Sequence, residues 1–403
     1  MGVHWVVCGG DIVMQDGLVD DGAVVVVHGR IAWVGRRAAL PRRVDDPWGR
    51  GTVRVNALPE LHVGGRLVAP GLIDLHVHGG GGADVMDGTL DAWEALAAAH
   101  AAHGTTSLLV TTLTAPADEL LRIARMIPEA VRTSESRSWR GARILGLHLE
   151  GPYIHPERAG AQNPAYIRPP NPAEMERLLE AADGWLRLVT LAPELPRAET
   201  VIAMLRRAGV AVAMGHTTAT YDEAMQAVEL GVGHAAHTFN AMTGLQAREP
   251  GAVGAVLLDP RVRAEVIADM HHVHPAVLRL LVKLKGANGV CLITDAIAAM
   301  GQGDGRLLLG GIPVHVKDGV CRLESGALAG SVLSMDRALA NMVRTVGVPL
   351  ADAVTMAAQT PAAAIGAHDA GAIVPGRRAD LIVLDDELCC RLTMVAGRIV
   401  HKN

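Results

Sequence analysis

The middle of the chain alternates between short apolar runs and longer segments in which apolar residues recur every three or four positions. The first pattern is typical of buried β-strands, and the second of helices that pack one face against a sheet. We predict strands at 72–78, 105–112, 143–150, 186–191, 210–215, 232–238, 264–269 and 290–294. Most gaps between them predict helices, at 90–103, 117–132, 172–182, 198–208, 221–230 and 275–285, followed by helices near 334–346 and 350–364.

This alternation predicts an α/β fold, a (β/α)8 TIM-type barrel over residues 69–365. A doubly wound open sheet is the rival fold, but no GxGxxG motif follows the first predicted strand. The gap at 240–260 lacks a clear period, and we expect it to be mostly loop.

The two ends of the chain carry a different pattern, in which β-rich runs are separated by turn residues. Such runs lie at 3–8, 24–28 and 31–34, and again at 380–384, 391–395 and 398–401. Hairpins of this size are marginal alone, so the two ends are expected to pack together. We therefore predict a small β-sandwich domain built from residues 1–68 and 366–403. The pattern of residues 36–66 predicts no regular element.

Composition narrows the possible functions. Half of the 403 residues are apolar, which excludes wholesale disorder, and the net charge of −5 comes without a basic block. We therefore expect neither nucleic-acid nor anionic-membrane binding. No apolar run reaches 18 residues, and the start (Met1–Cys8) does not have the pattern of a signal peptide. The five cysteines form no CxxC pair, so we expect reduced thiols and a cytoplasmic protein.

Histidines and carboxylates gather where the predicted barrel strands end. His76 and His78 end the first strand, Glu150 the third, and His216, His237 and Asp295 the fifth, sixth and eighth. The carboxyl ends of barrel strands meet at one mouth, and imidazole and carboxylate are ligands that zinc and similar divalent ions prefer. The sequence therefore predicts a metal centre there, with Asp295 as general base and then general acid.

Each of these residues also has an ordinary structural explanation. A second HxH pair, His272 and His274, occurs elsewhere, so the pair alone is a weak signal. His76 and His78 are stronger candidates for metal ligands than a chance pair, because positions i and i+2 of a strand face the same way. His148 supports the metal site or is simply packed, and His234 is expected to be structural. We assign no function to His100, His103, His271, His315 and His368.

The distribution of lysine excludes one common metal bridge. Lysine occurs only at 283, 285, 317 and 402, and the other 33 basic residues are arginine. Many two-metal hydrolases on this fold bridge their ions with a carboxylated lysine on the fourth strand. No lysine precedes 283, so Glu150 on the third strand is expected to fill that role.

Together these segments resemble the amidohydrolase superfamily and, within it, the N-acetylglucosamine-6-phosphate deacetylase family. The resemblance spans nearly the whole chain. The HLEGP and HxxNAM segments are specific to the deacetylase branch, whereas HxH belongs to the wider superfamily. The matching segments lie at 70–78, 146–153, 191–194, 215–217, 237–242, 248–251, 294–296 and 328–331.

The resemblance implies roles for particular residues. Glu150, His216 and His237 would hold a principal divalent metal, and His76 with His78 would allow a second. Zinc is expected first, with iron, cobalt, manganese or nickel as alternatives. The sugar-phosphate contacts implied are Ala161, Gln162, Asn240, Ala241, Arg248, His272, Leu328, Ala329, Gly330 and Ser331.

The implied activity is hydrolysis of the N-acetyl group of N-acetyl-D-glucosamine 6-phosphate in amino-sugar catabolism. Gln162 stands where many members carry a histidine, which leaves the galacto epimer or another N-acyl amine as alternative substrates. A non-catalytic barrel scaffold is the alternative from a different class. The family also implies a homodimer, in which Arg248 would reach a neighbouring subunit's site.

Overall fold

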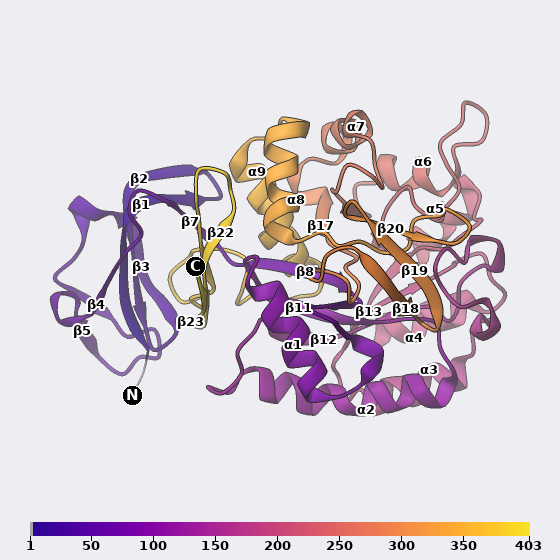
Figure 1. The fold of residues 1–403 in the computed structure, drawn as a ribbon, viewed down its shortest axis with the longest axis horizontal. Helices are drawn as coiled ribbons and strands as arrows, with labels where there is room; N and C mark the ends of the chain where they lie inside the picture. The colour runs from indigo at the N-terminus through magenta and orange to yellow at the C-terminus, as the bar shows by residue number, and fades with distance from the viewer. Residues whose placement is uncertain (1–2) are drawn as a thin grey trace.

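The centre of the computed structural model, which describes residues 3–403, is a parallel sheet of eight strands that closes into a barrel (Figure 1). Met1 and Gly2, which belong to the predicted range 1–68, lie outside the described residues. The last strand returns to the first, since the Asp295 N–H donates to His76 O at 3.0 Å. The strands are β8 (Leu72–Val77), β11 (Thr105–Thr112), β12 (Arg143–Glu150), β13 (Leu186–Leu191), β14 (Ala211–Met214), β15 (His234–Ala235), β16 (Arg263–Ile267) and β17 (Val290–Ile293). The predicted barrel is confirmed.

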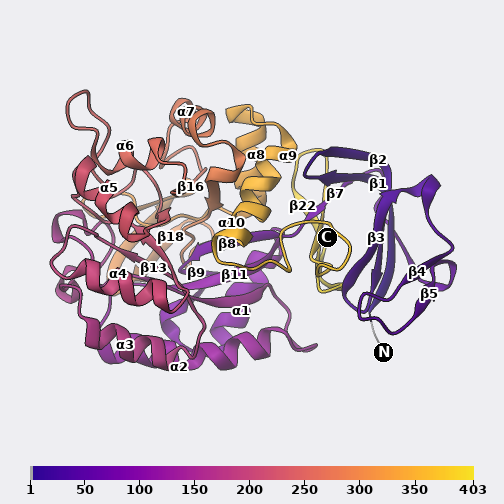
Figure 2. The same ribbon diagram turned by 180° about the vertical axis from the view of Figure 1, so that it is seen from behind.

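Helices surround this sheet, as Figures 1 and 2 show from opposite sides. They bury one stripe of apolar residues against the strands, as Leu120, Ile123 and Ile127 do in α2. The helices are α1 (Leu90–Ala101), α2 (Ala117–Ser134), α3 (Pro172–Ala181), α4 (Ala198–Arg207), α5 (Tyr221–Leu230), α6 (Gly251–Leu258), α7 (Pro275–Lys285), α8 (Met335–Asn341), α9 (Leu350–Val354) and α10 (Thr360–Ala364).

Two parts of the barrel differ in detail from what the sequence predicts. The expected loop at 240–260 contains α6, whose residues are buried on every side up to Leu257. Because no face of α6 is polar, the segment has no amphipathic period that could have revealed it. The sixth strand, predicted at 232–238, is only two residues long, because His237 leaves the strand with a left-handed backbone.

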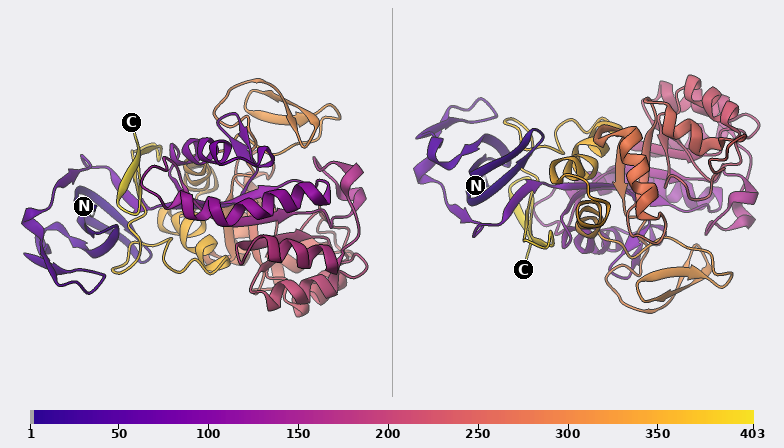
Figure 3. Two further views of the ribbon diagram at one scale, coloured as in Figure 1. Left: turned by 90° about the horizontal axis from the view of Figure 1, so that it is seen from below. Right: turned by 90° about the horizontal axis from the view of Figure 1, so that it is seen from above.

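A small antiparallel sheet that the sequence did not predict follows the last barrel strand. It consists of β18 (Gly305–Leu309), β19 (Ile312–Lys317) and β20 (Val320–Leu323). Figure 3 shows it projecting at the side of the barrel. Its buried side chains, among them Val314, Val316 and Leu309, pack with Leu113 and Ile297 of the barrel loops. The insertion therefore stands beside the barrel mouth.

Strands from both chain ends form one further sheet, which confirms the expected β-domain. Its path runs β23 (Arg398–Lys402), β22 (Cys390–Val395), β21 (Leu381–Leu384), β7 (Leu67–Pro70), β1 (His4–Met14), β2 (Gly17–Val27) and β3 (Arg30–Arg36), with β6 (Glu60–His62) beside β1. One apolar cluster joins side chains of both ends, such as Val24 and Met394. The predicted boundaries at 68–69 and 365–366 stay a prediction.

The unassigned segment 36–66 covers the second face of this sheet. It forms β4 (Arg43–Asp45), β5 (Thr52–Arg54) and β6, and Val44 and Val55 pack onto Val25 and Val27. Successive side chains of a strand point to opposite faces, so the valine run of β2 is buried on both sides. The short strands β9 (Gly79–Gly80) and β10 (Ala83–Asp84) follow the first barrel strand.

Two further properties concern membranes and thiols. Within residues 3–403 no helix is long and apolar enough to cross a membrane. All five cysteines are free: Cys389 is exposed, and the other four are buried. The adjacent Cys389 and Cys390 therefore do not pair with each other.

Candidate active site

A pocket of about 390 Å³ opens at the carboxyl ends of the barrel strands. His78, Glu150, His216, His237 and Asp295 line it, each at or just after the end of its strand. His76 lies directly beneath them, fully buried. The structure thus brings all six residues of the predicted metal centre to one place.

The Glu150 carboxylate is the centre of this cluster. Its Oε1 lies 3.2 Å from His76 Nε2, 3.2 Å from His216 Nε2 and 2.9 Å from His237 Nε2. Its Oε2 lies 3.3 Å from His78 Nε2 and accepts a short hydrogen bond from the Gln162 amide. One carboxylate therefore faces both pairs of histidines.

The outer ring nitrogens of three histidines face acceptors. His76 Nδ1 lies 3.3 Å from a Glu265 carboxylate oxygen. His78 Nδ1 lies 3.2 Å from the carbonyl of Thr111, and His216 Nδ1 lies 2.7 Å from that of Arg158. A carbonyl only accepts, so His78 and His216 each carry a proton on Nδ1, and their Nε2 atoms face the centre.

The Nε2 atoms of these histidines meet at close range, which tests whether the site fits a metal. His76 Nε2 and His78 Nε2 are 3.2 Å apart, and His216 Nε2 and His237 Nε2 are 3.1 Å apart. Facing lone pairs repel unless a cation or proton lies between them. Two overlapping groups have ligand atoms within 4.8 Å of one another, namely His76, His78 and Asp295, and His76, Glu150 and His237. The donor set therefore fits one or two divalent ions.

Charges in the cluster shift the protonation of its members. Burial lowers the pKa of His78, but the Asp295 and Glu150 carboxylates outweigh burial and raise that pKa to about 9. Burial raises the pKa of Asp295, and the charges of His76 and His78 outweigh it, so the pKa of Asp295 falls below its usual value. Asp295 is thus ionised at neutral pH, as a general base must be.

The backbone is strained where it presents these groups. His216, His237 and Asp295 have φ values of 48°, 29° and 50°, in the left-handed region that non-glycine residues rarely adopt. In the loop after His237, Phe239 and Ala241 also have positive φ values, of 81° and 52°. Such strain persists only where the surrounding structure enforces it, and it concentrates at functional sites. These residues are therefore held where a regular strand would not place them.

Comparison with known proteins gives this cluster a context. The Amidohydrolase family model matches residues 67–400. This chain belongs to the amidohydrolase family.

Two members of this family are identical to the chain at more than a third of the aligned positions. It is 41% identical over 334 residues to the N-acetylgalactosamine-6-phosphate deacetylase of Escherichia coli O157:H7, covering 83% of this chain and 87% of the relative. It is 39% identical to the N-acetylglucosamine-6-phosphate deacetylase of Vibrio furnissii, covering 82% of each.

A solved structure shows the same fold along nearly the whole chain. It is an aspartate-to-alanine mutant of the N-acetyl-D-glucosamine-6-phosphate deacetylase from Mycobacterium smegmatis, in complex with N-acetyl-D-glucosamine-6-phosphate. The TM-score is 0.89 and the identity 36%, with 99% of this chain and 100% of that chain covered.

In this amidohydrolase barrel, sequence reasoning missed a buried carboxylate behind the histidines. Glu265 of β16 is fully buried, and one of its oxygens faces His76 while the other has no partner among the described residues. A single acidic residue inside the apolar run 264–267 was the available signal. His148, for which the sequence allows either a supporting or a packing role, lies between Thr111 Oγ1 and Thr190 Oγ1 with its ring against that of His76. It is packed beneath the centre, and burial lowers its pKa well below the usual value.

The predicted substrate contacts divide into two groups. Seven of them line the pocket, and three do not. Arg248 is exposed on the loop before α6, Ala329 is buried in the inserted sheet's core, and the Ser331 hydroxyl donates to Thr294 O at 2.6 Å. The seven that line it are Ala161, Gln162, Asn240, Ala241, His272, Leu328 and Gly330.

Proposed function

We propose that this chain hydrolyses the N-acetyl group of N-acetyl-D-glucosamine 6-phosphate, releasing D-glucosamine 6-phosphate and acetate. One observation carries the proposal: an ionised Asp295 stands at the mouth beside an imidazole–carboxylate cluster that fits a divalent ion. The names of the relatives supply the substrate class.

Glu150, His216 and His237 would hold the principal ion, and His76, His78 and Asp295 surround a second position. A divalent ion bound there supplies Lewis-acid chemistry, acidifying water and polarising a carbonyl. Zinc is the first expectation for such ligands, with iron, cobalt, manganese and nickel as alternatives. Elemental analysis of the purified protein gives both the identity of the ion and its stoichiometry.

Asp295 moves the protons of the reaction. Its carboxylate accepts a proton from the water whose oxygen attacks the acetyl carbon. It then returns that proton to the sugar nitrogen as the C–N bond breaks, so that a neutral amine and acetic acid are formed, and the acid then releases its own proton to solvent to become acetate. Its position is fixed from both sides, because its N–H donates to His76 O and its carbonyl accepts the Ser331 N–H at 2.8 Å.

Gln162 would orient the acetyl carbonyl. Its Oε1 accepts the Thr114 N–H at 2.6 Å, and its amide donates one N–H to Glu150. An amide nitrogen carries two N–H groups, so one remains for the substrate at the wall of the pocket. Unlike a histidine at this position, Gln162 cannot become cationic.

The sugar phosphate would bind beyond the histidines. The Ala241 N–H makes no hydrogen bond within residues 3–403, and His272 has its Nδ1 turned to Asp269 at 2.7 Å, which leaves Nε2 free.

Arg248 lies outside the pocket, and its exposure supports a role at the site of a second subunit in the expected homodimer. A mixture of Arg248→Ala and Asp295→Asn subunits tests this, because shared sites would regain activity that neither variant has alone. Sedimentation tests the dimer directly.

The decisive assay measures acetate release from N-acetylglucosamine 6-phosphate, from its unphosphorylated form and from the galacto epimer, with Zn²⁺ added. We expect rapid release from the first substrate and little without the phosphate. The 41% identical relative, named for the galacto compound, favours that epimer as the second candidate. Release from the epimer alone would change the assigned substrate, and release from none of the three would contradict the proposal.

The free thiols support the expected cytoplasmic location, which cell fractionation tests.

A further inference from the structure

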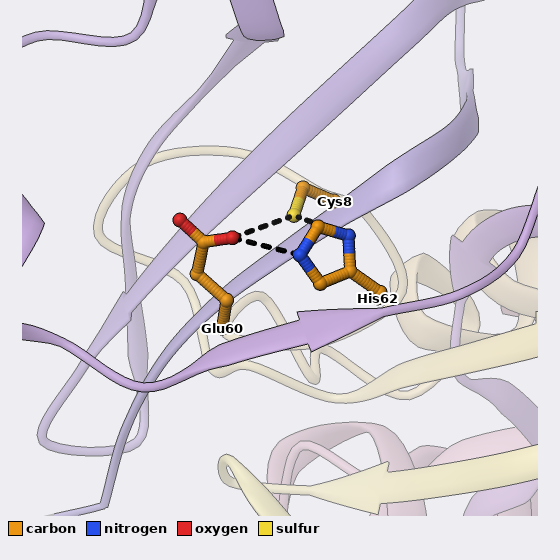
Figure 4. Close-up of side chains that lie close together, drawn as sticks. All are labelled: Cys8, Glu60 and His62. Atoms are coloured by element: carbon orange, nitrogen blue, oxygen red, sulfur yellow. Dashed lines mark hydrogen bonds and ion pairs between the residues drawn. The ribbon is translucent and has the colours of Figure 1, made fainter.

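A second group of potential metal ligands lies in the terminal β-domain, apart from the barrel mouth. Cys8 of β1 and His62 of β6 are direct neighbours across a parallel strand pair. Glu60 precedes His62 by two positions, so its side chain is on the same face of the strand. Figure 4 shows the thiol, the imidazole and the carboxylate turned toward one another.

The distances between these groups match those of a coordination site. Cys8 Sγ lies 3.7 Å from His62 Nδ1 and 4.0 Å from Glu60 Oε2. A tetrahedral zinc ion, with bonds of about 2.3 Å to sulfur and about 2.0 Å to nitrogen or oxygen, holds such ligand atoms about 3.5 Å apart. The imidazole is already close to this spacing, and Glu60 Oε2 reaches it by turning from His62 Nε2, 2.8 Å away, toward the sulfur.

The local backbone leaves room around the imidazole. A register shift interrupts the pairing of β1 with β2 between Cys8 and Gly10, and the intervening Gly9 has a φ of 81°. A Cβ at Gly9 would lie 3.4 Å from His62 Nδ1, on the nitrogen that faces the thiol. Bulges of this kind redirect side chains and often stand beside functional sites.

Solvent reaches the group from one side only. Cys8 is 2% exposed and packs with the apolar cluster of Val25 and Val27, whereas the side chains of Glu60 and His62 are about half exposed. An ion can thus enter over the carboxylate and imidazole and meet the thiol at the bottom. The fourth position of a tetrahedral ion would face solvent and take water.

We propose that Cys8, Glu60 and His62 form a binding site for a thiophilic divalent ion of the Zn²⁺ class. On binding, the Cys8 thiol loses its proton to solvent and the ion takes the place of that proton. Thiolate selects zinc-like ions over Mg²⁺ and Ca²⁺, which prefer oxygen ligands. The ion would also tie the edge strand β6 to β1.

The same groups could instead activate the thiol as a nucleophile, because His62 Nε2 also lies 2.8 Å from Glu60 Oε2. The burial of Cys8 argues against this, since a substrate carbon or phosphorus could not approach the sulfur. Burial also raises the pKa of the Cys8 thiol above its usual value. Without a cation the group therefore stays a thiol at neutral pH.

Titration with Co²⁺ tests the proposal, using the full-length protein freed of metal by a chelator, so that neither the barrel mouth nor the Cys8 group already holds an ion. Thiolate coordination gives a charge-transfer absorption that the histidines and carboxylates of the barrel mouth cannot give. We expect one equivalent of Co²⁺, beyond any bound at the barrel mouth, to bind with this absorption and to release one proton from the thiol. Cys8→Ser should abolish the absorption, and His62→Asn should weaken Co²⁺ binding at least tenfold.

The matched controls separate this site from others. Cys389→Ser removes the exposed thiol and should leave the absorption unchanged. His62 is half exposed, so His62→Asn should fold normally and should keep the wild-type rate of acetate release. An absorption that survives both Cys8→Ser and His62→Asn, or that never develops in the wild type, overturns the proposal.

Discussion

Replacing Asp295 with asparagine isolates the proton chemistry of the site from its geometry. The backbone of residue 295 is anchored by hydrogen bonds to His76 O and from the Ser331 N–H, at 3.0 Å and 2.8 Å. Asparagine has the same shape, so it should occupy the same place. What it loses is the ability to take a proton from water and return it to the amine.

The expected magnitude follows from the neighbours. General acid–base catalysis contributes about 10²–10⁴-fold in rate. The neighbouring carboxylate of the cluster, Glu150, cannot substitute, because it is engaged by four imidazoles and by Gln162. Both proton transfers depend on Asp295, so we expect kcat to fall by the upper part of that range, about 10³–10⁴-fold. This corresponds to about 4–5.5 kcal/mol of barrier.

The assay is steady-state acetate release, measured beside the metal content of the same preparation. The variant should retain the ion of the Glu150–His216–His237 group. Asp304→Asn is the matched control, because that exposed aspartate of the inserted region faces no histidine of the cluster. A kcat within tenfold of wild type would refute the reasoning. Loss of all bound metal would also refute it, because the carboxylate would then act chiefly as a ligand.

Three further predictions concern the groups around the site and the stability of the fold. Glu265→Gln keeps the shape beside His76 but removes the charge, and metal affinity measured by chelator competition should fall about 10–100-fold, whereas the exposed Glu229→Gln should leave it unchanged. Removing the metal with a chelator should abolish acetate release and lower the melting temperature, since an ion at 1,000 times its Kd adds about 4 kcal/mol of stability; equal melting curves with and without metal would contradict this. A hydrogen bond to Asp336 raises the pKa of His103, so the stabilisation is complete below the ordinary imidazole pKa of about 6.5 and is lost as the pH rises through the raised value. Denaturant unfolding from about pH 6 to about pH 8 should thus show a decline that is smaller in His103→Gln.

Some elements of the fold could be predicted from the local pattern of apolar and polar residues, because that pattern alone determines them. Seven of the eight barrel strands lie close to their predicted ranges, since a strand buried in a parallel sheet is a short apolar run. The pattern did not predict helix α6, and it predicted strand β15 too long, for the opposite reason. Helix α6 is buried on all sides and so lacks a polar face, and β15 is cut short by the left-handed backbone at His237. Contacts from distant segments, rather than the local sequence, determine both.

The sequence by itself determined which residues could do the chemistry. Histidines and carboxylates at strand ends must meet at one mouth once the strands form a barrel, and this placed Glu150, His216, His237 and Asp295 together in advance. It did not determine what stands behind them. Glu265 lies 189 positions from His76 in the chain, and only closure of the barrel brings the two within 3.3 Å.

Tertiary structure also decided what the terminal segments can bind. Cys8 and His62 are far apart in the chain, and no spacing rule connects them. They meet because β6 pairs in parallel with β1, and that register follows from the apolar residues that both strands bury beneath them. The pattern of single residues thus specifies elements and reactive groups, whereas the pairing of distant strands specifies which groups come within reach of one another.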